Sequence, residues 1–182
     1  DFDYPCQTRF WRVVVLLVLL VPALRVGASE LFDQGAEALL YNRPREAVAI
    51  FEKVIEEEPV NGRAYLYLAL GYEQLAMYER AITTLQRAEN VPGVDRSVVR
   101  FNIGNNFLHL GDAEGAFTSY SAAIEVNPVA VDPYLNRANL GVSLEQYEQA
   151  VADYETVLEI APEHPQRPEI ERMLALLRDH VE

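Results

Sequence analysis

The stretch that decides the fold is residues 104–128, GNNFLHLGDAEGAFTSYSAAIEVNP. It places one small residue, Gly104, twelve positions before a second small residue, Ala116. A large residue, Tyr120, follows four positions later. Small side chains let two backbones approach closely, and large ones fill the space on either side, as interdigitated cores require. The stretch therefore predicts two packed helices, with Gly104 facing Ala116.

The two helices are separated and ended by residues that break helices. Gly111 lies between them, and Pro128 ends the second one. Gly and Pro act for opposite reasons, one by backbone freedom and the other by a missing donor. We therefore expect a helical hairpin with helices over 97–110 and 114–127.

The same layout occurs four times along the chain, at intervals of 34, 35 and 34 residues. Such a period is typical of stacked helix-turn-helix repeats. The central small residues are Ala47, Ala81, Ala116 and Ala150, the large ones are Phe51, Leu85, Tyr120 and Tyr154, and the earlier small ones are Gly35, Ala69, Gly104 and Ala138.

The four units resemble tetratricopeptide repeats, and the chain is similar to exported bacterial proteins of that family. The resemblance implies an all-α fold, a right-handed superhelix of four helix-turn-helix repeats plus a C-terminal capping helix. One hairpin cannot bury both its apolar faces, so neighbours must stack. The repeat domain is expected at 29–182, with repeats at about 28–61, 62–95, 97–130 and 131–164 and the capping helix at about 169–181.

Two repeats depart from the pattern. In the first, Gln34 and Ala38 occupy places where a large apolar residue is usual, so its first helix is expected to pack less well. In the fourth, Arg137 stands where the neighbouring repeats have Leu68 and Ile103, a place expected to be buried. A charge there must be paired or must reach solvent. This departure predicts either looser packing or a spot where another chain inserts.

Residues 1–28 differ from the rest of the chain. Arg9 and Arg12 precede an apolar run at 13–24, and small residues lead to an expected cut before Ser29. This order describes a secretory signal peptide. A membrane-spanning helix needs about 20 apolar residues, and the run at 13–24 is shorter than that. An uncleaved membrane anchor is therefore the alternative and not the first interpretation. The first interpretation predicts a periplasmic or otherwise exported protein, and the second predicts an inner-membrane anchor with the repeats outside the cytoplasm.

Composition and motifs argue against several classes of protein. The chain has 28 acidic and 15 basic residues, a net charge of −13, so no nucleic-acid partner is expected. Its one cysteine, Cys6, allows no intrachain disulfide and no thiolate cluster. No HExxH, GxSxG or phosphate-binding glycine loop occurs. We expect a non-enzymatic protein with no catalytic residue, no cofactor and no metal.

The family resemblance places the partner-binding surface on the first helix of each repeat, which lines a concave groove. One groove-facing row is apolar in every repeat, and the neighbouring rows change from apolar to amide along the chain. The apolar part is expected at the N-terminal end, where it would take a partner's apolar side chains. The predicted groove residues are Phe32, Leu66, Tyr67, Leu70, Phe101, Asn102, Asn105, Leu135, Asn136 and Asn139.

The four asparagines of this set allow two interpretations. Each amide offers two donors and an acceptor, which matches the peptide unit, so a row of them would hold an extended backbone of any sequence. Alternatively, asparagine is common at these places in the family and ties neighbouring helices together. The family's clamp for the C-terminal carboxylate of heat-shock chaperones needs Lys or Arg beside the asparagine. The corresponding places around Asn102 hold no cation, so that clamp is not expected.

These features favour a protein–protein interaction scaffold of the bacterial cell envelope that binds a peptide or partner protein in its groove. One alternative is an accessory protein that binds a small hydrophobic ligand beside an envelope transporter. Another is a structural subunit of an envelope assembly, in which the chain forms a homo-oligomer. A membrane is expected to be involved only through residues 1–28, if they stay uncleaved.

Overall fold

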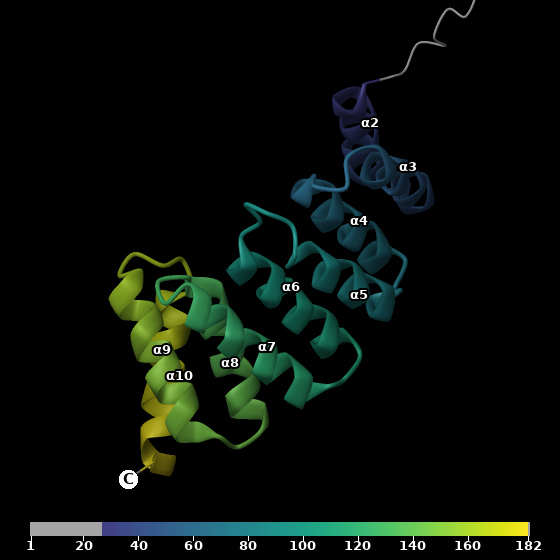
Figure 1. Cartoon of the computed structure of the whole chain (residues 1–182). Coiled ribbons are helices and arrows are strands. Elements are labelled where there is room, and N and C mark those ends of the chain that lie inside the picture. Colours follow the sequence, from purple (N-terminus) through teal and green to yellow (C-terminus); the bar gives the residue numbers. More distant parts are fainter. Residues whose placement is uncertain (1–26, 182) are drawn as a thin grey trace, which may run out of the picture.

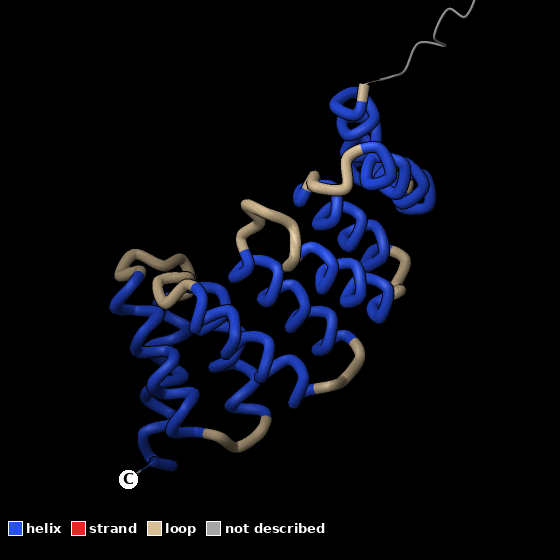
Figure 2. Tube along the Cα trace, in the orientation of Figure 1, coloured by secondary structure: helices blue, strands red, loops and turns tan. Residues whose placement is uncertain are grey.

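The computed structural model describes residues 27–181, which form helices and turns without a strand in that range (Figures 1 and 2). Four consecutive helix pairs precede a last helix, so the predicted all-α repeat fold is confirmed. The pairs are α2 (Ala28–Leu40) with α3 (Pro44–Glu57), α4 (Gly62–Gln74) with α5 (Tyr78–Ala88), α6 (Arg96–His109) with α7 (Ala113–Val126), and α8 (Val131–Ser143) with α9 (Tyr147–Ile160); the last helix is α10 (Arg167–Val181).

Contacts between the helices follow their order in the chain. The second helix of each pair packs on the first helix of the next pair, so α3 contacts α4, α5 contacts α6, and α7 contacts α8. Figure 1 shows the resulting stack, with α2 at one end and α10 beside α9 at the other. Such nearest-neighbour packing defines a solenoid, in which each repeat is stabilised by the repeats beside it.

In the first and third pairs, the large residue of the second helix lies across the small residue of the first. A Cβ atom added to Gly104 would lie 2.6 Å from Tyr120 Cε1, and one added to Gly35 would lie 2.8 Å from Phe51 Cζ. The sequence predicted that Gly104 faces Ala116, whereas the side chain nearest to Gly104 is that of Tyr120. The close approach is therefore between a backbone and an aromatic ring.

The turn between the two helices of each pair contains one residue in the left-handed region of backbone space. These equivalent residues are Asn42 (φ 55°), Ala76 (φ 54°), Gly111 (φ 76°) and Glu145 (φ 58°). Glycine adopts this conformation without steric cost, and asparagine tolerates it. Ala76 and Glu145 carry a Cβ atom in a conformation that disfavours one, so their turns are locally strained.

The first repeat packs better than its sequence predicted. The ring of Phe32 lies 5.3 Å from that of Phe51 and 5.0 Å from that of Tyr67, and Phe32 supplies the large apolar side chain that Gln34 and Ala38 lack. At the other end of the stack, α10 buries an apolar face against α9. That face comprises Ile170, Leu174 and Leu177.

Arg137 is paired inside the fourth repeat, which is one of the two outcomes expected for a charge at that place. Its Nε and Nη2 atoms donate to the two carboxylate oxygens of Asp153 at 2.8 and 2.7 Å, and Nη1 donates to Ser121 Oγ at 2.8 Å. The side chain of Asp153 is only 2% exposed. The ion pair therefore lies in the core and joins α8 to α9 and α7.

The predicted signal peptide or anchor at 1–28 lies outside the described residues, apart from the backbone of its last two positions. Among the helices that the structure describes, none combines the length and the apolar character needed to cross a bilayer.

Candidate partner-binding face

The first helices of the repeats carry a row of side chains along the stack that are exposed or half-buried. Residues three or four apart share a helix face, and on α4 such a row runs from Arg63 through Leu66 and Leu70 to Glu73. Equivalent rows follow on α6 and α8. We call this surface the inner face: Arg63, Leu66, Leu70 and Glu73 on α4, Val98, Phe101, Asn102, Asn105 and Leu108 on α6, and Leu135, Asn136 and Asn139 on α8.

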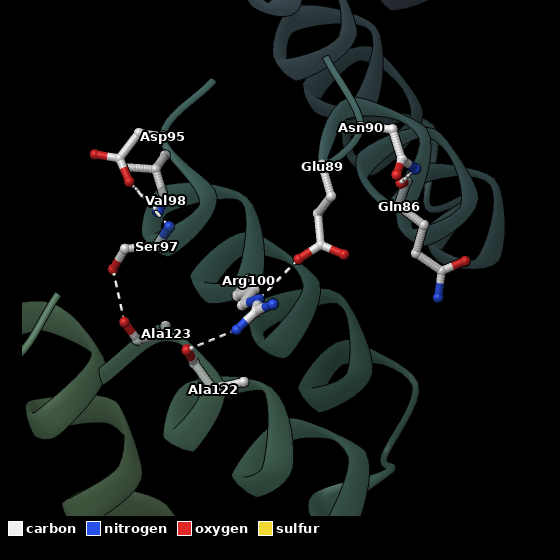
Figure 3. A network of polar contacts seen from close by, with 9 residues as sticks. All are labelled: Gln86, Glu89, Asn90, Asp95, Ser97, Val98, Arg100, Ala122 and Ala123. Atoms are coloured by element: carbon white, nitrogen blue, oxygen red, sulfur yellow. Dashed lines mark hydrogen bonds and ion pairs between the residues drawn. The ribbon is translucent and has the colours of Figure 1, made fainter. Parts of the chain in front are cut away.

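Helix α6, the central helix of the inner face, is fixed by polar contacts at its start (Figure 3). Asp95 Oδ1 caps it by accepting from the backbone amides of Ser97 and Val98 at 2.9 and 3.2 Å. Arg100 Nε donates to Glu89 Oε1 at 2.8 Å, while Ser97 Oγ and Arg100 Nη1 donate to carbonyl oxygens of α7. These bonds hold α6 to the end of α5 on one side and to α7 on the other.

The prediction for Phe32 was wrong, because this residue is not open to a partner. Its side chain is 8% exposed and lies in the N-terminal core. Tyr67 packs on one side of the ring, and the guanidinium of Arg63 lies 4.7 Å from its centroid. Helix α4 therefore covers the N-terminal end of the predicted apolar row, which starts at Phe32. Tyr67 is itself half-buried and contacts Phe51 at 5.4 Å.

The open apolar part of the inner face lies on α4 and α6 instead of at the N-terminal end. Leu70, Val98 and Leu108 are 42%, 43% and 46% exposed. The predicted residues Leu66, Phe101 and Leu135 are half-buried beside them along the stack. Exposed apolar side chains on the first helices of successive repeats are candidates for covering by a partner.

The asparagines tie neighbouring helices together, which is one of the two roles that the sequence allowed. Asn105 Oδ1 accepts from the Tyr120 hydroxyl at 2.8 Å and from Asn136 Nδ2 at 3.0 Å, which ties α6 to α7 and α8. Asn139 Oδ1 accepts from the Tyr154 hydroxyl at 2.6 Å. Burial raises the pKa of both tyrosines, so their hydroxyls stay protonated donors.

The hydrogen bonds from the tyrosines orient the two side-chain amides, because each tyrosine hydroxyl donates to the Oδ1 atom of its asparagine. Within residues 27–181, the Nδ2 atoms of Asn105 and Asn139 donate to no protein group and remain available to a ligand's carbonyl oxygens. Asn102 differs, because its Nδ2 donates to the Val98 carbonyl of its own helix at 3.0 Å.

The sequence did not predict the buried polar contact between Asn106 and Glu73. Asn106 is fully buried, and its Nδ2 donates to Glu73 Oε1 at 2.5 Å and to the Asn102 carbonyl at 2.8 Å. Asn106 Oδ1 is buried without a partner in the part of the chain that the structure describes. A signal was present, because the equivalent places in the neighbouring repeats hold Gly71 and Leu140.

Burial raises the pKa of the Glu73 carboxyl above its ordinary value, against the opposing effects of the hydrogen bond from Asn106 and of nearby His109. His109 stacks on Tyr78, with ring centroids 4.9 Å apart. A carboxylate with a raised pKa on an interaction face is the kind of perturbed group that is enriched at functional sites.

Cavities lie near the first repeats, and two of them differ in the residues that line them. One of about 290 Å³ adjoins the inner face between the starts of α4 and α6, where Arg63, Leu66 and Val94 line it. Another, of about 410 Å³, opens between α3 and α5 and is lined by charged residues such as Glu52 and Arg80. Of these two, the first adjoins the inner face, because Arg63 and Leu66 belong to both.

The stacked helical pairs and their exposed inner face define a helical-repeat protein of the solenoid class. Family models for the tetratricopeptide repeat match residues 32–95 and 131–164. The chain belongs to the tetratricopeptide repeat family.

Relatives of known sequence match only part of the chain. Human sperm-associated antigen 1 is 34% identical over 88 residues, which cover 48% of this chain and 10% of the relative. The rat mitochondrial import receptor subunit TOM34 is 33% identical over 88 residues, which cover 48% of this chain and 28% of the relative. The matched region is thus a small part of both relatives.

Solved structures share the fold over most of the chain. MamA superposes with a TM-score of 0.71 at 18% identity, covering 85% of this chain and 82% of that one. YrrB, described as a TPR protein with an unusual peptide-binding site, gives 0.66 at 15% identity, covering 90% and 82%. The first TPR of RPAP3, bound to an HSP90 peptide, gives 0.57 at 20% identity, covering 66% and 92%. At these identities the likeness shows the fold alone.

Proposed function

We propose that the protein is a non-enzymatic interaction scaffold that binds an extended segment of a partner protein on its inner face. The observation that carries the proposal is the exposure of Leu70, Val98 and Leu108 on adjacent helices. Their apolar side chains would be covered by a partner, and burying apolar surface is the main favourable term in association.

The asparagines supply the second element of the proposed site. The Nδ2 atoms of Asn105 and Asn139 would donate to backbone carbonyl oxygens of the bound segment, while Tyr120 and Tyr154 hold the amides in place. Backbone contacts of this kind confer affinity without demanding one side-chain sequence. The HSP90 peptide bound to the first TPR of RPAP3 and the peptide-binding site described for YrrB give precedent for a peptide ligand on this fold.

Affinity capture with matched variants tests the proposal. The double variant Leu70→Ser and Leu108→Ser removes apolar side chains from the inner face. The control, Leu144→Ser and Leu176→Ser, removes leucines that are also exposed but lie on the turn before α9 and on α10. We expect the inner-face variant to lose a specific partner about tenfold and the control to retain it. Equal retention by both variants would refute the proposal.

We further propose that the scaffold works in the bacterial cell envelope. Support comes from the basic start, apolar run and small residues of positions 1–28, which describe an export signal. N-terminal sequencing of the protein from its native source is expected to begin at Ser29. A native protein that retains residues 1–28 and fractionates with membranes would favour the anchor instead.

A second candidate function is the binding of a small hydrophobic ligand. The cavity of about 290 Å³ beside Leu66 and Val94 favours it. Calorimetric titration of the wild type and of Leu66→Arg with a medium-chain fatty acid tests this candidate. The substitution would place a charge in the cavity. Binding to the wild type that Leu66→Arg abolishes would support the candidate, and no heat with the wild type would rule out that ligand class.

A further inference from the structure

Glu73 occupies an unusual place on the inner face. It lies one helical turn beyond Leu70 on α4, and Asn106 of α6 holds its Oε1 atom at 2.5 Å. In the part of the chain that the structure describes, Glu73 forms no ion pair. A half-buried carboxylate therefore stands in an apolar surface with one neutral hydrogen-bond donor.

Basic residues near this surface are already engaged elsewhere. Arg63, at the other end of the α4 row, stacks on the ring of Phe32. Arg100 pairs with Glu89 at 2.8 Å, and Arg137 pairs with Asp153 at 2.7 Å. Among the described residues no arginine or lysine pairs with Glu73, and His109, which lies close enough to lower its pKa, forms no ion pair with it.

A carboxylate in this setting is costly to the folded protein. Burial disfavours its charged form, which is why the pKa of Glu73 is raised, and the single bond from Asn106 offsets only part of that effect. A cation arriving from outside would recover this energy, because charge-assisted hydrogen bonds are stronger where water is partly excluded. The net charge of −13 would also attract a basic segment.

We propose that Glu73 is the specificity site of the inner face and binds a lysine or arginine side chain of the partner segment, with apolar residues on either side of it. Leu70, which lies one helical turn before Glu73 on α4 and is exposed, would take one of those apolar residues. The inference rests on the proposed function and gives it a ligand class. The proposed arrangement is the reverse of a carboxylate clamp. In a clamp the protein supplies the cation, whereas here it would supply the carboxylate.

A positional-scanning library of hexapeptides, acetylated and amidated so that neither end is charged, tests this directly. The full chain as it occurs in its source is immobilised as wild type, as Glu73→Gln and as Glu79→Gln. Glu73→Gln keeps the shape and an acceptor for Asn106. Glu79→Gln removes the same charge from an exposed position on α5 and is the matched control.

We expect the wild type and Glu79→Gln to select Lys or Arg over Glu at one position by about tenfold, which corresponds to about 1.4 kcal/mol. Glu73→Gln is expected to lose this selection while keeping the preference for apolar residues beside it. Selection of basic residues that persists in Glu73→Gln would overturn the inference, as would peptide binding by the wild type without basic selection. Failure of the wild type to bind any peptide would overturn the proposed function as well, so the two failures are distinguishable.

Discussion

At the scale of single residues, Glu73 links stability to the proposed site. Its pKa is raised, so the folded state holds the proton more tightly than the unfolded state, whose carboxyl has the ordinary value of 4.5. Between these two pKa values the wild type loses stability as the pH rises, and above the higher one the loss is complete. The protein thus carries a destabilising group on its inner face.

Glu73→Gln is therefore expected to increase the free energy of unfolding at pH 7. The gain should shrink as the pH falls and vanish below the unfolded pKa, where both side chains are neutral. Urea denaturation followed by circular dichroism at several pH values measures this. A variant that is less stable than the wild type at pH 7 would show that the Glu73 carboxylate stabilises the fold.

The buried pair of Arg137 and Asp153 gives a second prediction at this scale. Arg137→Leu leaves Asp153 charged, 2% exposed and unpaired, and is expected to cost about 3–5 kcal/mol. Adding Asp153→Thr reproduces the combination Leu68 and Thr84 of the second repeat and should restore most of the stability. Denaturation midpoints of the single and double variants measure these changes in stability. If Arg137→Leu alone were as stable as the wild type, the prediction would be contradicted.

At the scale of elements, the turns within the helix pairs differ in strain. Ala76 and Glu145 have φ values of 54° and 58°, where Gly111 has 76° in the equivalent turn. Ala76→Gly and Glu145→Gly should each stabilise the protein by about 0.5–1 kcal/mol, and Gly111→Ala should destabilise it by a similar amount. Thermal denaturation checks the signs. Destabilisation by both glycine substitutions would contradict the strain.

At the scale of the whole molecule, the repeat period determined most of the fold. The spacing of Ala47, Ala81, Ala116 and Ala150 predicted the helix pairs, because a small residue that must sit under a neighbour recurs once per repeat. The burial of Phe32 could not be predicted, since it depends on how Arg63 and Tyr67 of the next repeat lie over the ring.

The polar contacts of the inner face show where sequence reasoning stops. Glu73 and Asn106 are 33 positions apart, and only the packing of the second repeat on the third brings the carboxylate to the amide. The groove asparagines were predicted from the family resemblance, but their partners Tyr120 and Tyr154 were known only as core residues. Residue type and period thus predicted candidates for the face, and the structure shows which of them are buried, as Phe32 is, and how the others are oriented.

The central claim is that the inner face is where this scaffold meets its partner, and site-specific photo-crosslinking in the native cell tests it most directly. A benzophenone amino acid is placed at Leu70 or at Leu176, which are 42% and 64% exposed. The account predicts one discrete crosslinked product from position 70, competed by unlabelled wild-type protein, and none from position 176. A discrete product from position 176 with none from position 70 would contradict it.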